Sequence, residues 1–215
     1  MSMPGIRTNL TLEDFKEALE LLDSLVNEPV DLNVVGGFAL VVHGLRSSGV
    51  TADIDTASPS FSREVEYAVE EVAERLNLPP DWLNNDSVFS FGDETTQDDV
   101  DAFNDMLDAA YEHVDLGFRN IRLYVADLST LAKSKAYAAS DIGVGRTEKD
   151  VDDLINVLHA MGLFTPDQAA KALPWLNDPE FKETLKALNS RLPISDPLNY
   201  PPRSNRTQFF RRQSR

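Results

Sequence analysis

The sequence predicts an α+β protein, with a small mixed sheet flanked by helices and a helical C-terminal part after it. Short apolar runs and amphipathic segments alternate over the first 126 residues, whereas the later segments have helical apolar spacing throughout. The chain has 215 residues, of which 42% are hydrophobic and 26% charged, as in globular proteins with a substantial core. We therefore expect a folded domain over residues 1–127, a helical region over 128–192 and a Pro-rich, basic, flexible tail over 193–215.

The first predicted element is a helix over Thr11–Asn27. Its apolar residues recur at helical spacing; they are Leu12, Phe15, Ala18, Leu19, Leu22 and Val26. Thr11 precedes acidic residues in the first turn, which is typical of a helix N-cap. Pro29 cannot continue the helix and predicts its end.

Two short strands are predicted next, separated by a small helix. Leu32–Val35 is apolar and stops at two glycines, and Phe38–Gly44 has the apolar character of a short buried helix. Thr51–Thr56 alternates in polarity, as a half-buried strand does. This alternation predicts that Asp53 and Asp55 share one face of the second strand.

The remaining predicted elements are mostly helical. Phe61–Leu78 is an amphipathic helix, which Pro79-Pro80 ends. Gln97–His113 is predicted to be an acidic helix, followed by two strands over residues 114–116 and 121–125. From Leu128 onward the sequence predicts successive helical segments: LSTLAKSKAYAAS, RTEKDVDDLINVLHAMG, TPDQAAKALPWLN and DPEFKETLKALNSRL.

The net charge limits the classes of partner. The whole chain carries −16, but Pro197–Arg215 holds five arginines and no Asp or Glu, which leaves −21 on the rest. A body this acidic repels polyanions at long range and disfavours broad nucleic-acid binding. The tail is either a solvated terminus or an arm that contacts phosphate or the acidic body, and both interpretations stay open.

Three features that the sequence lacks indicate where in the cell the protein is expected to be. The chain has no cysteine, which excludes disulfides and thiolate metal sites. No apolar run approaches the roughly 18 residues that a membrane helix needs, and the N-terminus lacks the basic-then-apolar plan of a secretory signal. We therefore expect a cytoplasmic protein without a membrane partner.

The segment Val34–Ser58 contains the clearest chemical pattern. Gly36 and Gly37 follow a predicted strand, where glycines let the backbone approach a phosphate closely. Two aspartates at i and i+2 of a strand, Asp53 and Asp55, are about 6–7 Å apart, a spacing that suits binding of divalent cations. Magnesium favours such oxygen ligands and usually bridges to substrate phosphates. On these residues alone, a turn and a solvated strand edge are an equally good interpretation.

A second pattern lies in Leu131–Leu154, which reads LAKSKAYAASDIGVGRTEKDVDDL. Phosphoryl-type transfer depends on positioning and on neutralising the phosphate charge, work that a helical lysine such as Lys135 suits as a point charge. Asp150 would then position Lys135 or activate an attacking hydroxyl. The competing interpretation of Lys149, Asp150 and Asp153 is ordinary ion pairing on one helix face.

Together the two patterns resemble the nucleotidyltransferase superfamily. GGFALVVHG…VTADID and the later Lys-x-x-Ala…Arg…Lys-Asp-x-x-Asp block are similar to the bacterial abortive-infection AbiE-type toxins and their uncharacterised relatives. The resemblance covers scattered blocks of residues 32–160 and implies roles for particular residues. It implies Asp53 and Asp55 as ligands of Mg²⁺, Gly36, Gly37, Lys135 and Arg146 as nucleotide-binding residues, and Asp53, Asp55, Lys135 and Asp150 as catalytic residues.

The sequence departs from the family pattern in two places. Fifteen residues separate Gly37 from Asp53, slightly more than the pattern usually has, and the extra length lies after Arg46. Many family members also have a third carboxylate on a later strand. Here Asp115 is the first candidate for it, with Asp127 behind it.

The resemblance implies a magnesium-dependent enzyme that moves a nucleotidyl group from an NTP to an acceptor hydroxyl. It further implies the toxin of a bacterial toxin–antitoxin or abortive-infection system, with an RNA (for example a tRNA) or a protein as acceptor and a cognate antitoxin as partner. The alternative hypothesis is a non-catalytic protein of the same fold that binds nucleotide or another protein.

Overall fold

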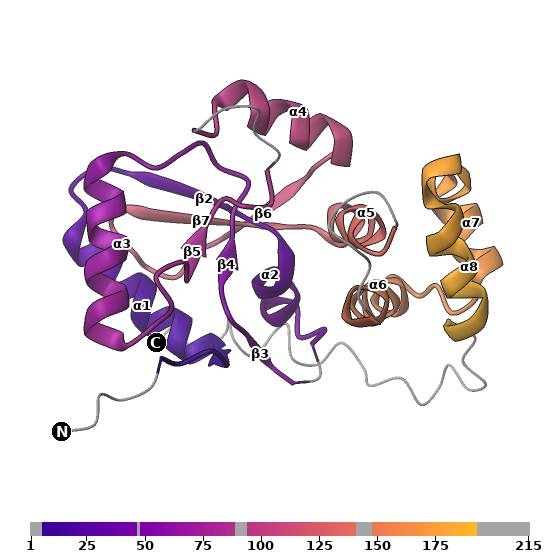
Figure 1. Ribbon diagram of the computed structural model, residues 1–215, viewed down its shortest axis with the longest axis horizontal. Helices are drawn as coiled ribbons and strands as arrows, with labels where there is room; N and C mark the ends of the chain where they lie inside the picture. The colour runs from indigo at the N-terminus through magenta and orange to yellow at the C-terminus, as the bar shows by residue number, and fades with distance from the viewer. Residues whose placement is uncertain (1–5, 47, 89–93, 141–147, 193–215) are drawn as a thin grey trace. The chain divides into compact units, whose positions relative to one another are not determined.

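The computed structural model describes residues 6–46, 48–88, 94–140 and 148–192, and the chain divides into two compact units (Figure 1). The first unit contains Met1–Val42 and Ser48–Asp127, and the second contains His43–Ser47 and Leu128–Arg215. Among the described residues, the strands all belong to the first unit, and the regular structure of the second is helical. The predicted α+β class, with small mixed sheets and a helical C-terminal part, is therefore confirmed. The predicted basic tail lies outside the described residues.

The first unit is built around a three-stranded sheet in the order β2-β7-β6. β2 (Val30–Val34) runs parallel to β7 (Ile121–Ala126), and β6 (Tyr111–Val114) runs antiparallel to β7. The register pairs Val34 with Val125, so β2 and β7 end at the same edge of the sheet. The residues that follow these two strands therefore start from neighbouring positions.

A further pair of short strands adjoins the end of β2. β4 (Ile54–Asp55) runs parallel to β5 (Leu83–Asn84), and an isolated bridge between Val34 and Thr56 connects this pair to the central sheet. The loop before β5 is anchored by Trp82, a fully buried residue whose indole N–H donates to the backbone carbonyl of Val69, in the helix Arg63–Leu76 (α3), at 3.1 Å.

The predicted strand over Thr51–Thr56 is divided in the structure. Its first part belongs to β3 (Val50–Thr51), which pairs antiparallel with β1 (Leu10–Thr11), whereas its later part is β4. The prediction of one continuous strand was wrong because the two ends pair with different partners. Asp53 lies between these short strands, and Asp55 is the last residue of β4.

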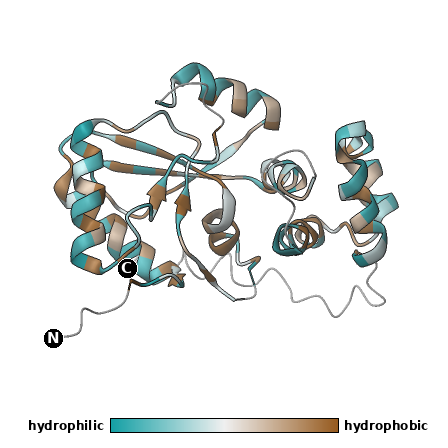
Figure 2. Cartoon of the chain, viewed as in Figure 1, coloured by the Kyte–Doolittle hydropathy of each residue, from teal (hydrophilic) through white to brown (hydrophobic). Residues whose placement is uncertain are grey.

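The helices of the first unit follow the apolar spacing closely. α1 (Leu12–Leu25) begins at a capping box in which the Thr11 hydroxyl and the Asp14 carboxylate each accept from the other's backbone N–H, so the predicted N-cap is confirmed. α2 (Gly36–Val42) and α3 (Arg63–Leu76) bury most of their apolar residues in the core, although Tyr67 of α3 is exposed. Figure 2 shows hydrophilic and hydrophobic residues alternating along α3.

One helix is shorter than predicted. α4 (Gln97–Leu107) ends at Asp108, which adopts a left-handed conformation with φ of 53°. The predicted helix continued to His113, but Tyr111–Val114 forms β6 instead. Local polarity did not distinguish these states, because pairing with the buried β7 determines the conformation of this segment.

The start of β7 is fixed by a carboxylate of α1. The side chain of Asp23 accepts backbone N–H groups of Arg119, Asn120 and Ile121 at 3.1, 2.6 and 2.9 Å. Burial acts to raise the pKa of Asp23, but the three backbone hydrogen bonds outweigh it and hold the pKa below its usual value.

Replacing Asp23 by Ala is expected to lower the free energy of unfolding by about 2–3 kcal/mol, because three backbone donors lose a charged acceptor. Urea denaturation measures this loss at neutral pH. The lowered pKa means that the contribution of Asp23 is present above the unfolded-state pKa of about 3.9 and is lost as pH falls below it. Asp23→Ala should accordingly cost less at about pH 3 than at neutral pH, and an equal cost at both would contradict this account.

The second unit consists of helices joined by short segments. Its helices are α5 (Leu128–Ala138), α6 (Glu148–Ala160), α7 (Pro166–Ala172) and α8 (Lys182–Arg191), with short 3-10 turns at Pro174–Asn177 and Pro179–Phe181. A small core of Ala139, Val151 and Ala187 joins α5, α6 and α8. None of the helices in the described parts of the chain has both the length and the apolar character needed to cross a bilayer.

A buried histidine of α6 makes this unit sensitive to pH. His159 is 7% exposed, and its ring stacks on Phe164 with the ring centres 5.5 Å apart. Burial lowers the pKa of His159, against a hydrogen bond with the backbone of Leu192 that acts to raise it. The folded state therefore binds this proton less readily than the unfolded state does.

The free energy of unfolding is therefore expected to fall as pH is lowered from about 7.5 through the unfolded-state pKa of about 6.5 toward about 5. His159→Gln should reduce this slope, which urea denaturation at several pH values measures. His113→Gln, at an exposed histidine, is the matched control and should retain the slope. Equal slopes for wild type and His159→Gln would contradict the assignment.

Candidate functional site

Gly36 and Asp55 of the first pattern meet in the first unit. Gly36 has a φ of +63°, a conformation that L side chains rarely adopt, and the carboxylate of Asp55 packs directly against its Cα. A Cβ at position 36 would lie 2.1 Å from Oδ2 of Asp55. The lack of a side chain at Gly36 therefore makes room for the Asp55 carboxylate.

The backbone fixes this approach. The N–H of Val35, just before Gly36, donates to the carbonyl of Asp55 at 2.9 Å, and the N–H of Ala57 donates to the carbonyl of Asn33 at 2.7 Å. The strand that carries Asp55 is thus tied, on both sides of Thr56, to the end of β2 just before the glycine. Asp53 and Asp55 are both partly buried, and Gly37 is buried at the start of α2.

The sheet register discriminates between the two candidates for a third carboxylate. Asp127 follows β7, and its N–H donates to the carbonyl of Ala110 at 2.9 Å, at the edge of the sheet where Gly36 follows β2. Asp115 follows β6 and lies toward the opposite edge, because Val114 pairs with Leu123 near the start of β7. Asp127 is therefore the better candidate, which reverses the order that the sequence suggested.

The chemistry of the donor set suits magnesium. Within the described ranges no group of three or more His, Asp or Glu side chains could hold a metal ion together. Magnesium is commonly bound by one or two carboxylates, with water and substrate phosphates completing its shell. Asp53 and Asp55 fit that pattern in number and in type of ligand.

The second pattern forms a cluster of four charged side chains in the second unit, between α5 and α6. The Nζ of Lys135 lies 3.5 Å from Oδ1 of Asp150 and 3.3 Å from Oδ2 of Asp153. The same Oδ2 accepts from Nη2 of Arg46 at 2.8 Å, and Nε of Arg46 lies 3.5 Å from the other oxygen. We call these four residues the Arg46–Asp153 cluster.

The cluster is largely shielded from water. The side chains of Arg46 and Asp153 are 8% and 5% exposed, and those of Lys135 and Asp150 are 10% and 19% exposed. Two cations and two carboxylates balance in charge, which is how buried ionic groups are tolerated in proteins. Lys135 is held here by the buried face of α5, where its neighbours include Leu131, Ala132 and Ala136.

Sequence reasoning missed two members of this cluster. Asp150 was expected beside Lys135, but Asp153 and Arg46 were not assigned to the site. A signal for Asp153 was present, because its spacing from Asp150 places both residues on one helix face. Arg46 comes from a segment 107 residues away and had no local signal.

The structure brings the predicted residues together in two groups. Gly36, Gly37, Asp53 and Asp55 lie in the first unit, whereas Lys135 and Asp150 lie in the second. Arg146 lies outside the described residues. No family model matches the chain, and comparisons with curated proteins and with solved structures find no match either.

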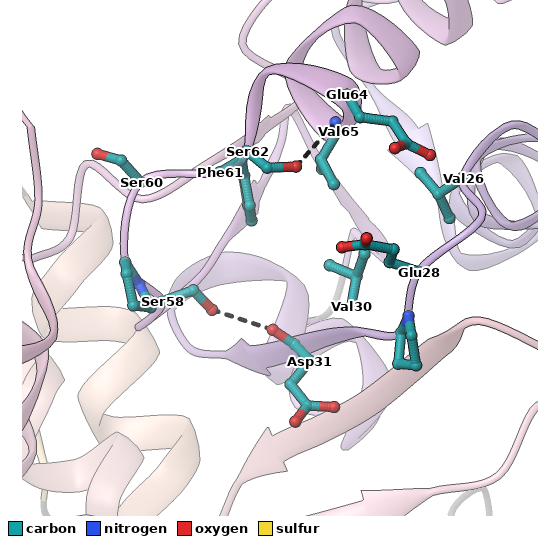
Figure 3. Close-up of a pocket in the computed structure, with 12 residues that line it drawn as sticks. Val26, Glu28, Val30, Asp31, Ser58, Ser60, Phe61, Ser62, Glu64 and Val65 are labelled. Carbon is teal, nitrogen blue, oxygen red and sulfur yellow. Dashed lines mark hydrogen bonds between the residues drawn. The ribbon is translucent and has the colours of Figure 1, made fainter.

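A separate pocket of about 300 Å³ lies at the other end of β2 (Figure 3). Its wall includes Glu28, Asp31 and Glu64 and none of the predicted site residues. The Glu64 carboxylate accepts from the backbone and side-chain N–H groups of Asn27 at 2.9 and 3.1 Å. Because these walls are acidic, the pocket is a poor site for a triphosphate.

Proposed function

We propose that the protein is a magnesium-dependent nucleotidyltransferase, which moves a nucleotidyl group from an NTP to an acceptor hydroxyl and releases pyrophosphate. The observation that carries the proposal is the approach of the Asp55 carboxylate to Gly36. Glycine adopts this conformation without strain, and its lack of a side chain allows the backbone to approach a ligand closely. The resemblance to AbiE-type toxins supplies the reaction class.

In this proposal the first unit provides the metal ligands and the phosphate cradle. Asp53 and Asp55 hold Mg²⁺, which when bound neutralises charge on the phosphate oxygens. Gly36 and Gly37 let the backbone approach the triphosphate. Asp127, at the shared edge of the sheet, is the candidate for a third carboxylate that acts without ligating the metal, since the described residues form no group of three that could hold a metal ion together.

For the second unit, the resemblance implies a phosphate-binding role of its own. Lys135 binds a phosphate as a point charge. Asp150, 3.5 Å from the Lys135 ammonium, orients it or accepts the proton of the attacking hydroxyl. The position of Arg146 in the resemblance adds a further phosphate-binding cation.

The proposed biology is that of a toxin in a bacterial toxin–antitoxin or abortive-infection system, with a cognate antitoxin as partner. The acceptor is an RNA end, for example of a tRNA, or a protein hydroxyl. The acidic body disfavours RNA, while the arginines of residues 197–215 favour it.

The test is transfer of label from each of the four α-labelled NTPs, with Mg²⁺, to total RNA and to total protein. Asp53→Ala and Asp55→Ala should each lower transfer more than about 100-fold, since loss of a metal ligand should cost at least as much as loss of an outer-shell partner. Asp127→Asn should also lose transfer, whereas Asp115→Asn, at an exposed aspartate toward the other sheet edge, should retain it. Wild type that is as inert as the Asp53 and Asp55 variants, without an NTP-induced shift in Tm, would sink the proposal.

A non-catalytic, nucleotide-binding role on the same fold is the second candidate. It is favoured by the ion pairs of Lys135, whose ammonium already lies near two carboxylates. In that case NTP with Mg²⁺ raises Tm in wild type and not in Asp55→Ala, while no label is transferred to either class of acceptor.

A further inference from the structure

Arg46 holds the most buried carboxylate of the Arg46–Asp153 cluster. Its guanidinium contacts both oxygens of Asp153, with the shorter contact, at 2.8 Å, in the range of a charge-assisted hydrogen bond. The contacts of Lys135 to Asp153 and Asp150 are longer, at 3.3 and 3.5 Å. Asp153 is thus bound more closely by Arg46 than by Lys135.

The distances around Asp153 indicate what Lys135 would do if Arg46 were absent. Asp153 is 5% exposed, so water cannot replace a missing cation. Without Arg46, the nearest compensating charge in the cluster is the Lys135 ammonium. We therefore expect Asp153 to form a close ion pair with Lys135. The N–H donors of the Lys135 ammonium are then no longer available to a ligand.

We infer that Arg46 is a positioning residue, which satisfies Asp153 so that the Lys135 ammonium remains available to a phosphate group of a ligand. This inference rests on the proposed function for the ligand, but the position of the ammonium does not depend on it.

The experiment compares Arg46→Met, Arg46→Lys, Asp153→Asn and the double variant Arg46→Met/Asp153→Asn in the full chain. ATP affinity with Mg²⁺ is measured by calorimetry. Arg46→Met should weaken binding about 10-fold, the scale of one hydrogen bond to a charged group. The double variant should recover affinity to within about 3-fold of wild type, because the neutral amide that replaces the Asp153 carboxylate no longer captures the lysine.

Comparison of affinity with stability separates positioning from a merely structural role, because Asp153→Asn also relieves the unpaired buried charge. The Tm of each variant is therefore measured beside its ATP affinity. A residue that only stabilises the fold would let affinity follow Tm and would leave the reactivity of Lys135 unchanged, and that result overturns the inference. Arg46→Lys keeps the charge without the planar fork, and it should fall between wild type and Arg46→Met.

A second measurement is independent of nucleotide. The rate at which an amine-acylating reagent modifies Lys135 is followed by mass spectrometry in the same variants. Acylation should slow several-fold in Arg46→Met and recover in the double variant. If wild type binds no NTP while this pattern holds, the proposed function fails and the positioning role stands. If acylation is unchanged in Arg46→Met, the positioning role fails whatever the nucleotide result.

Discussion

Asp153→Ala is expected to lower the free energy of unfolding by about 3–5 kcal/mol, the cost of leaving buried charge without its partner. The substitution removes the carboxylate that lies between Arg46 and Lys135, two cations whose side chains are 8% and 10% exposed. Of the two carboxylates in the cluster, Asp150 alone then remains beside these cations. Urea denaturation followed by circular dichroism measures the loss, and hydrogen exchange locates it in α5 and α6.

The adjacent residue offers a matched control. Asp152 is on the same helix, but its side chain is 57% exposed and pairs with Arg191 of α8. An exposed ion pair of this kind contributes about 0–1 kcal/mol, so Asp152→Ala should have little effect. Similar losses for Asp152→Ala and Asp153→Ala would show that the buried cluster does not stabilise the unit as described.

The helices were predictable because their signals are local. The spacing of apolar residues and the Thr11 cap define α1 within one segment, and the structure agrees within about two residues at each end, the usual uncertainty of helix boundaries. The same holds for α3, where Ser62 caps the first turn and Asn77 ends the helix in a left-handed conformation.

The short strands were not predictable in the same way. Two-residue strands such as β4 and β5 have too few residues for a period-two pattern, and they exist because partners distant in the chain pair with them. The division of Thr51–Thr56 and the strand at Tyr111–Val114 are both set by such pairing. A single sequence carries no local signal for pairing across tens of residues.

The residues of the candidate site likewise fall into those with a local sequence signal and those without one. The residue types and their spacing indicated the glycines, the aspartates and Lys135. The Arg46–Asp153 pair joins residues 107 apart, and the choice of Asp127 over Asp115 needed the register of β6 and β7. What sequence could not supply in either case was the three-dimensional neighbourhood of a charged group.

Gly36→Ala is expected to cost about 2–5 kcal/mol of unfolding free energy. About 1–2 kcal/mol comes from placing a side chain at a φ of +63°. About 1–3 kcal/mol more comes from overpacking, because the new Cβ would overlap the Asp55 carboxylate. Thermal and urea denaturation measure the sum, and calorimetry with ATP and Mg²⁺ measures the effect on binding.

Gly49→Ala separates these two contributions. Gly49 has nearly the same conformation, with a φ of +65°, but among the described residues a Cβ there would meet no atom within 4 Å other than those of its chain neighbours. It should therefore show only the conformational cost of about 1–2 kcal/mol and leave ATP binding as in wild type. The difference between the two variants measures what the approach of Asp55 to Gly36 contributes. If both variants lose the same stability and bind ATP equally, the carboxylate moves aside without cost, and the contact loses its weight as support for a nucleotide site.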